Sequence, residues 1–150
     1  MLAGQGDHIS TVLKVKSNMD SGMFRAMQEA AVEALSNPPS WYERVNGVYL
    51  KRRIIVEEIM DLLKCRFDKS QTGLFVWGRI PEEISSCEEY VENIPQKANV
   101  FITPGFIFGS RGDRYIRISL CAEEGVLNEA KLRIREIASS RNDRIHYKSK

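Results

Sequence analysis

The segment Arg114–Leu120 constrains the fold most, because its aliphatic residues alternate strictly with polar or aromatic ones. Successive side chains of a β-strand point to opposite faces of the sheet. One face then holds Ile116, Ile118 and Leu120, and the other holds Tyr115, Arg117 and Ser119. A strand with one aliphatic face needs a covering layer, so the chain is expected to build a sheet packed against helices.

Two further strands are predicted from composition. Gly73–Ile80 is short, aromatic and β-branched, and Asn99–Thr103 is closed by Pro104-Gly105. Runs of this kind between glycine and proline residues are typical of strands. Together with Arg114–Leu120, they predict one sheet.

The first third of the chain is predicted to be helical. Apolar residues recur at helical spacing from Ile9 to Leu35, with a break at Ser17–Gly22 that indicates two helices meeting at a corner. Asn37-Pro38-Pro39 ends the second helix, because prolines remove backbone donors and restrict the residue before them.

A long helix is predicted next. Ser40 and Glu43 fit a capping box at its start. Lys51, Arg52 and Arg53 are consecutive, so they cannot all face a core. We expect them to form a solvated face.

Two more helices complete the predicted elements. Helix-start boxes at Ser85 and Ser86 predict a short helix that runs to about Asn93 and ends before Pro95. The last helix is predicted over 122–139, with an apolar stripe made of Val126, Leu127, Ala130, Ile134 and Ile137.

These elements describe an α+β fold: a two-layer small domain with helices packed on a mainly antiparallel sheet of three to four strands. The 150 residues suit one domain, and 43% hydrophobic residues can bury a core. With 22 basic and 20 acidic residues, the net charge of +2 gives little support for nucleic acid or membrane partners. No apolar run reaches the roughly 18 residues of a membrane span, so a cytoplasmic protein is expected.

Arg117 is the most informative candidate site residue. Lying between Ile116 and Ile118, it must send its guanidinium to the face opposite theirs. A planar fork of N–H donors there can clamp a carboxylate through two parallel hydrogen bonds. Alternatively, Arg117 pairs with a surface acid or lies over an aromatic ring. The neighbouring loop Thr103–Gly109 is predicted to form either a constrained rim or a plain buried turn.

The sequence contains no motif for a metal site, a disulfide framework or a glycine-rich phosphate-binding loop. Cys65, Cys87 and Cys121 have no C-x-x-C spacing, and His8 and His146 lie near the two ends. No metal site or disulfide framework is therefore predicted, and the cysteines are expected to be reduced, partly buried thiols. Glycine-rich phosphate-binding motifs are absent from the sequence.

Several motifs, taken in order, resemble one family. They are the S-N-x-D-S-G run within Lys16–Phe24, Tyr49 with Arg52 and Arg53, the aromatic strand Gly73–Trp77, T-P-G-x-x-F-G at Thr103–Gly109, and Arg117-Ile118-Ser119. This order resembles the C-terminal, small domain of fold-type-I aminotransferases that depend on pyridoxal 5'-phosphate (PLP). The aspartate and LL-diaminopimelate aminotransferases are the branch it resembles most, and the resemblance covers nearly the whole chain.

The resemblance implies roles for three residues. Arg117 would bind the substrate α-carboxylate, and Ser17 and Asn18 would approach an active site or a subunit contact. Residues 1–36 would be connecting helices toward a missing large domain, 37–140 the small domain and 141–150 a polar tail. The whole protein would be a homodimer that transfers an amino group between an amino acid and a 2-oxo acid.

The chain departs from the family in one important respect. The family's Schiff-base lysine lies in an S-K-x-x-x-x-x-G-x-R-x-G segment, which is missing here, and Leu2-Ala3-Gly4 resembles the residues just downstream of that segment. The lysines present lie outside such a context: Lys14, Lys16, Lys51, Lys64, Lys69, Lys97, Lys131, Lys148 and Lys150. No catalytic residue is therefore assigned. The isolated chain is expected to bind no PLP and to be inactive.

The alternative is a stand-alone α+β module that binds nucleic acid or a protein through its exposed sheet, Arg52, Arg53 and its basic tail. A basic stripe interleaved with exposed aromatic residues would favour it. Acids are mixed among the bases in this sequence, which counts against the binding module. The amino donor and acceptor, and whether the fragment is natural, stay open.

Overall fold

A computed structural model of the chain describes residues 2–146. The chain divides into two compact units, unit 1 (Met1–Glu43) and unit 2 (Arg44–Lys150). Unit 1 contains helices α1 (Gly6–Met19) and α2 (Arg25–Leu35), neither of which buries a residue. The predicted break between two helices is confirmed, but it lies at residues 20–24, because Ser17 to Met19 still belong to α1. Asp20, which follows α1, is extended, and its carboxylate accepts a hydrogen bond from the Gly22 N–H.

Helix α3 (Pro39–Leu62) begins one residue before the predicted cap. Ser40 lies inside its first turn, so the predicted capping role of Ser40 is wrong. Proline is favoured at the first helical position, because its fixed φ suits the helix and its missing N–H would have had no partner. Pro39 therefore starts the helix that the sequence predicted.

The sheet is antiparallel and has the order β1-β3-β2, with β1 (Phe75–Arg79), β2 (Thr103–Pro104) and β3 (Tyr115–Ser119). The predicted strand over Asn99–Thr103 is wrong in its bounds, since only Thr103 and Pro104 pair with β3. The chain leaves the preceding helix with Asn99 in the left-handed region, at a φ of 52°. The chain therefore bends at Asn99, and residues 100–102 lead into β2 without regular secondary structure.

Helix α4 (Cys87–Ala98) starts where one of the two boxes predicts, because the Ser86 hydroxyl accepts a hydrogen bond from the Glu89 N–H at 3.4 Å. The prediction that this helix ends before Pro95 is wrong. Val91, Ile94 and Ala98 are all buried, so packing on both sides of Pro95 outweighs the single backbone hydrogen bond that a proline removes.

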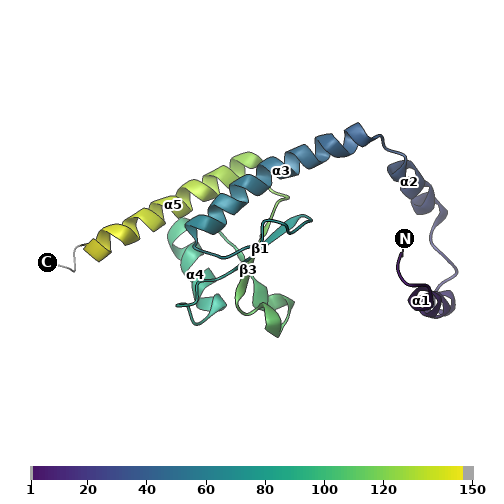
Figure 1. Ribbon diagram of the computed structural model, residues 1–150, viewed down its shortest axis with the longest axis horizontal. Helices are drawn as coiled ribbons and strands as arrows, with labels where there is room; N and C mark the ends of the chain where they lie inside the picture. Colours follow the sequence, from purple (N-terminus) through teal and green to yellow (C-terminus); the bar gives the residue numbers. More distant parts are fainter. Residues whose placement is uncertain (1, 147–150) are drawn as a thin grey trace. The chain divides into compact units, whose positions relative to one another are not determined.

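Helix α5 (Glu124–His146) extends past its predicted end at Ser139, and residues 147–150 lie outside the described part of the chain. In unit 2, α5 runs beside the later part of α3, and α4 lies against the same layer (Figure 1). The helices cover one face of the sheet, which confirms the two-layer α+β fold. The core includes Ile55, Val56, Ile59 and Met60 from α3, Val76 and Ile116 from the sheet, Ile80 and Leu120 just after its strands, Val91 and Ile94 from α4, and Leu127 and Ile134 from α5.

Two arginines of α3 are structural rather than solvated. Arg52 donates hydrogen bonds to the carbonyl oxygens of Leu120 and Cys121, and Arg53 donates one to the Gly73 carbonyl. The predicted solvated face is therefore wrong for both residues, although Lys51 is exposed. These carbonyl groups lie beyond the strand ends and have no partner in the sheet. The two guanidinium groups therefore supply their hydrogen-bond donors.

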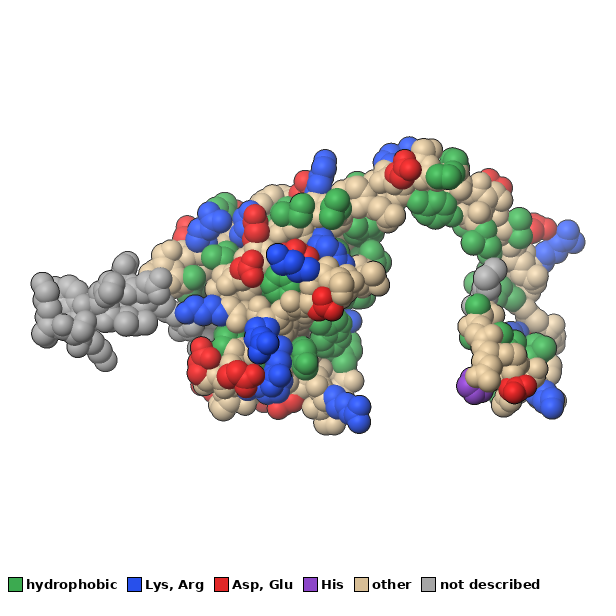
Figure 2. Space-filling model, in the orientation of Figure 1, with side chains coloured by type: hydrophobic (Ala, Val, Ile, Leu, Met, Phe, Trp, Pro, Cys, Tyr) green, Lys and Arg blue, Asp and Glu red, His purple; other side chains and the backbone are tan. Residues whose placement is uncertain are grey.

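Charges of both signs are interspersed over the face of unit 2 that Figure 2 shows. Ion pairs within unit 2 join Lys131 to Glu58 at 2.7 Å, Arg133 to Glu129 at 2.8 Å and Arg79 to Glu82 at 3.3 Å. This face lacks the basic stripe that a nucleic-acid-binding module would need.

Candidate functional site

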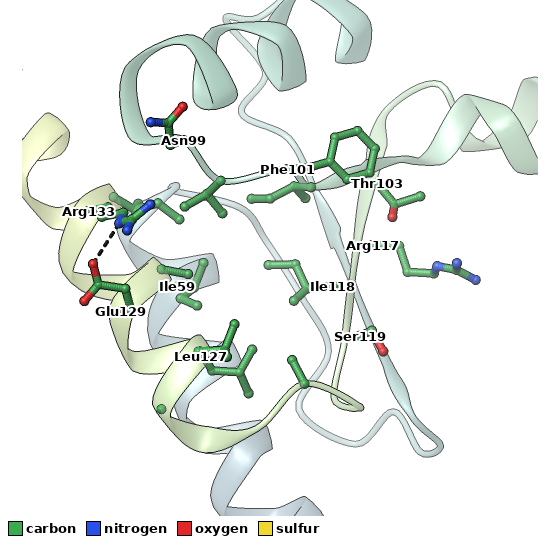
Figure 3. A pocket seen from close by; sticks show the side chains of 17 residues that line it. Ile59, Asn99, Phe101, Thr103, Arg117, Ile118, Ser119, Leu127, Glu129 and Arg133 are labelled. Atoms are coloured by element: carbon green, nitrogen blue, oxygen red, sulfur yellow. Dashed lines mark hydrogen bonds and ion pairs between the residues drawn. The ribbon is translucent and has the colours of Figure 1, made fainter.

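Arg117 occupies the middle of the central strand of the sheet. In the register of β3 it lies between Trp77 of β1 and Thr103 of β2. Its side chain leaves β3 on the side opposite Ile118 and points away from Ile59 and Leu127 of the helical layer (Figure 3). The alternation predicted for this strand is confirmed, because Ile116 is fully buried while Arg117 is half-buried.

Aromatic rings surround the Arg117 guanidinium. Its central carbon, Cζ, lies 4.0 Å from the ring centroid of Phe108 and 4.1 Å from that of Phe75. The Trp77 ring is 5.9 Å away, and it packs edge-on against the rings of Phe108 and Tyr115. Cations within about 6 Å of a ring centroid are attracted to the ring face. Arg117 therefore lies over aromatic rings, which is one of the two arrangements that the sequence left open as an alternative to carboxylate binding.

Among the side chains and backbone groups that the structure describes, the Arg117 side chain has neither an ion-pair partner nor a hydrogen-bond acceptor. The half-buried Arg114, by contrast, donates to the carbonyl oxygens of Pro81 and Ile84. The in-plane N–H groups of Arg117 thus stay available for a ligand. A half-buried cation with free, planar donors suits a carboxylate.

The loop before β3 places Phe108 at this site. Gly105–Phe108 and Ser110–Gly112 form two short 3-10 turns, η1 and η2, and Gly109 between them has a φ of 121°. A Cβ on Gly112 would overlap the Gly105 carbonyl oxygen, and a Cβ on Gly105 would lie 2.7 Å from the Tyr115 carbonyl oxygen. This close approach of backbones requires glycine at both positions. Of the two predictions for the loop, the structure favours the constrained rim.

Ser17 and Asn18 belong to the last turn of α1 in unit 1. The Ser17 hydroxyl and the Asn18 amide both donate to the Lys14 carbonyl oxygen, at 3.0 and 2.7 Å. Both side chains are exposed. Their contact with an active site or a subunit stays a prediction.

The buried cysteines are unsuited to nucleophilic chemistry. Burial raises the pKa of the Cys65 thiol to about 12 and also raises that of Cys87, whose thiol donates to the Tyr115 carbonyl oxygen at 2.9 Å. Thiolates rather than thiols are the reactive species. The expectation of buried thiols holds for these two residues, while Cys121 is exposed.

The residues around Arg117 do not by themselves fit PLP. That cofactor needs a lysine, an acid near its ring nitrogen and donors for its phosphate. The described side chains that contact the Arg117 guanidinium are phenylalanine and tryptophan rings. The side chains present can bind a carboxylate but offer no group for a Schiff base.

A cavity of about 600 Å³ opens beside the edge of β3, between residues 99–103 and α5. Its wall is mainly apolar, and Ile59, Ile118 and Leu127 point toward it (Figure 3). The Arg117 guanidinium points away from this group of side chains (Figure 3). Arg117 also belongs to the lining of this cavity, so the cavity borders the base of its side chain and not the guanidinium end.

Sequence reasoning missed the aromatic partners of Arg117. Phe75 lies two residues before Trp77, so both belong to the same face of β1, but the pairing of β1 with β3 could not be read from the sequence. Phe108 was part of the predicted rim without an assigned contact.

No helix among the described residues has the length and apolarity to cross a membrane.

Comparisons with known proteins identify relatives. No protein-family model matches the chain. The LL-diaminopimelate aminotransferase of Oleidesulfovibrio alaskensis is 37% identical over 134 residues, which cover 89% of this chain and 34% of that protein. An aminotransferase structure from Staphylococcus aureus has a TM-score of 0.73 at 29% identity, covering 91% of this chain and 36% of that one. A probable N-succinyldiaminopimelate aminotransferase from Thermus thermophilus has a TM-score of 0.74 at 26% identity, covering 89% and 35%. The chain spans about a third of the length of the curated relatives it matches.

Proposed function

Because this chain is a homologue of the C-terminal part of fold-type-I aminotransferases of the LL-diaminopimelate type, we propose that its Arg117 binds the α-carboxylate of an amino-acid substrate. The whole protein would transfer an amino group between an amino acid and a 2-oxo acid. In this proposal the chain contributes substrate binding and supplies no Schiff-base lysine.

One observation carries the proposal: Arg117 is half-buried, and among the described residues no acid neutralises it. Burial of a charge is unfavourable unless a partner compensates it. The aromatic rings compensate it in part. A substrate carboxylate would complete the compensation.

Arg117 would act by positioning. Two parallel hydrogen bonds from its planar fork would fix both oxygens of the carboxylate and therefore the direction of the bonds at Cα. Holding a reacting bond in one orientation lowers the entropic part of the barrier. Arg117 would transfer no proton, because arginine keeps its charge in proteins. PLP would supply the electron sink in the whole protein, held by groups outside this chain.

The rest of the protein would pack on unit 1. Its helices α1 and α2 bury no residue, and they expose large apolar side chains, including Met19, Phe24, Met27 and Leu35. Apolar surface of this kind usually marks a contact. We therefore assign residues 1–36 to contacts with a large domain and the second subunit of a homodimer, with Ser17 and Asn18 among them. Residues 37–140 would be the small domain of a cytoplasmic enzyme, and 141–150 its polar tail.

A side-chain NMR titration of the chain tests the proposal. L-alanine should shift the Nε–Hε signal of Arg117, and L-alaninamide, which lacks the carboxylate, should not. The exposed Arg111 serves as the internal control and should respond weakly to both ligands. Equal responses of Arg117 to the two ligands, or none to L-alanine, would contradict carboxylate binding.

A further inference from the structure

Two half-buried arginines of unit 2, Arg114 and Arg117, are held in different ways. Arg114 is held by the carbonyl oxygens of Pro81 and Ile84, which accept hydrogen bonds from its N–H groups. Arg117 is held by the rings of Phe108 and Phe75, whose centroids lie 4.0 and 4.1 Å from its Cζ. These rings accept no hydrogen bond from the N–H groups of Arg117. An aromatic ring attracts a cation through its face and accepts no in-plane N–H hydrogen bond from a stacked guanidinium.

We infer that Phe75 and Phe108 are positioning residues for Arg117: they restrict rotation of the guanidinium and leave its donor edge free for a carboxylate. The inference deepens the proposed function and rests on it for the identity of the ligand. An acidic side chain could also hold the guanidinium, but it would occupy the same donors and neutralise the same charge. Two phenyl rings restrict the guanidinium without occupying its N–H donors and without neutralising its charge.

The two rings come from separate elements, which makes the restriction effective. Phe75 is the first residue of β1, while Phe108 is the last residue of the η1 turn, and its ring also packs against Trp77 at a centroid distance of 5.4 Å. Phe108 is further fixed by the close approach of Gly105 and Gly112. Both phenylalanines are partly exposed, at 37% and 49%. Structural burial therefore does not account for large aromatic residues at both positions.

The experiment measures motion at Arg117 with no ligand present. In the isotope-labelled full chain, the order parameter of the Arg117 Nε–Hε bond should fall in Phe108→Leu and in Phe75→Leu. It should be retained in Phe108→Tyr, which keeps a ring. Phe101→Leu is the matched control, because Phe101 is 77% exposed and is not one of the rings over Arg117.

An acetate titration of the same samples adds the ligand. Acetate binding should weaken by about two- to fivefold in Phe108→Leu, the range that loss of one exposed cation–π contact corresponds to. An order parameter that is unchanged in both leucine variants would overturn the inference, whatever acetate does. An order parameter that falls as expected, with no acetate response in the wild-type chain, would instead uphold the positioning role and overturn carboxylate binding.

Discussion

The Cζ atom of Arg117 lies 4.0 Å from the ring centroid of Phe108, so the cation at the centre of the sheet is held by an aromatic face and not by an acid. Contacts of this kind contribute about 0.5–1 kcal/mol at exposed sites. The arrangement therefore stabilises the fold little while keeping a charged, planar donor group accessible. Its consequences for stability and for activity can be separated by mutation.

The first prediction concerns stability. Arg117→Lys keeps the positive charge and loses no intramolecular hydrogen bond, so the free energy of unfolding should change by less than about 1 kcal/mol. Arg114→Lys is the matched comparison, because Arg114 donates to two carbonyl oxygens that one ammonium group is poorly placed to serve together. It should cost about 1.5–3 kcal/mol. Urea unfolding of both variants checks this, and a larger loss in Arg117→Lys would assign Arg117 a structural role.

The second prediction concerns the rim. Gly112→Ala would place a methyl group against the Gly105 carbonyl oxygen, so the chain should lose about 1–3 kcal/mol of stability or more. Gly47→Ala is the control, since Gly47 lies within α3 with open space around it, and there alanine should gain about 0.5–1 kcal/mol. Thermal unfolding measures both. A stable Gly112→Ala variant would show that the two turns do not need their close approach.

The third prediction concerns alkaline pH. Burial raises the pKa of Cys65 from 9.0 to about 12, so above pH 9 the unfolded chain loses this proton while the folded chain keeps it. The folded state then binds more protons, and stability should fall between pH 9 and 12, by up to about 1.4 kcal/mol per pH unit. Cys65→Ala should lessen the decline, whereas Cys121→Ala, which alters an exposed thiol, should not. Equal slopes in both variants would refute the assignment.

The sheet could be predicted where the sequence has a strong local pattern. Alternation around Arg117 placed it correctly opposite the aliphatic core, since side-chain direction in a strand is local geometry. Strand register is not local. The contact of Phe75 with Arg117 depends on which residues of β1 and β3 pair, and no single strand contains that information.

Two of the failed predictions share a physical cause, because tertiary contacts outweighed the local pattern at Pro95 and at Arg52-Arg53. Pro95 lies inside α4, where buried Val91 and Ile94 hold the helix in place. Arg52 and Arg53 formed a plausible solvated run, but they serve carbonyl oxygens far away in the sequence. A run of basic residues has the same sequence pattern whether its side chains are hydrated or donate to distant backbone carbonyl groups.

The fourth prediction concerns the missing lysine. Incubation of the chain with PLP followed by borohydride reduction should label no single lysine stoichiometrically and should give no amino-acid turnover. Lys16 and Lys131, for example, are engaged with Asp20 and Glu58 in ion pairs. Peptide mapping of the reduced product measures the labelling. One fully modified lysine together with transaminase activity would contradict the proposed division of roles.

The central claim is the proposal that Arg117 binds a substrate carboxylate. Steady-state kinetics of a full-length aminotransferase with this chain as its C-terminal part tests the proposal most directly. Arg117→Lys loses the bidentate geometry, so kcat/KM should fall by about 10- to 100-fold for every amino-acid substrate, as expected for a charge-assisted hydrogen bond of about 1.5–3 kcal/mol. Arg111→Lys, the same change at an exposed position, should leave kcat/KM unaltered. An unaltered kcat/KM in Arg117→Lys would contradict the claim.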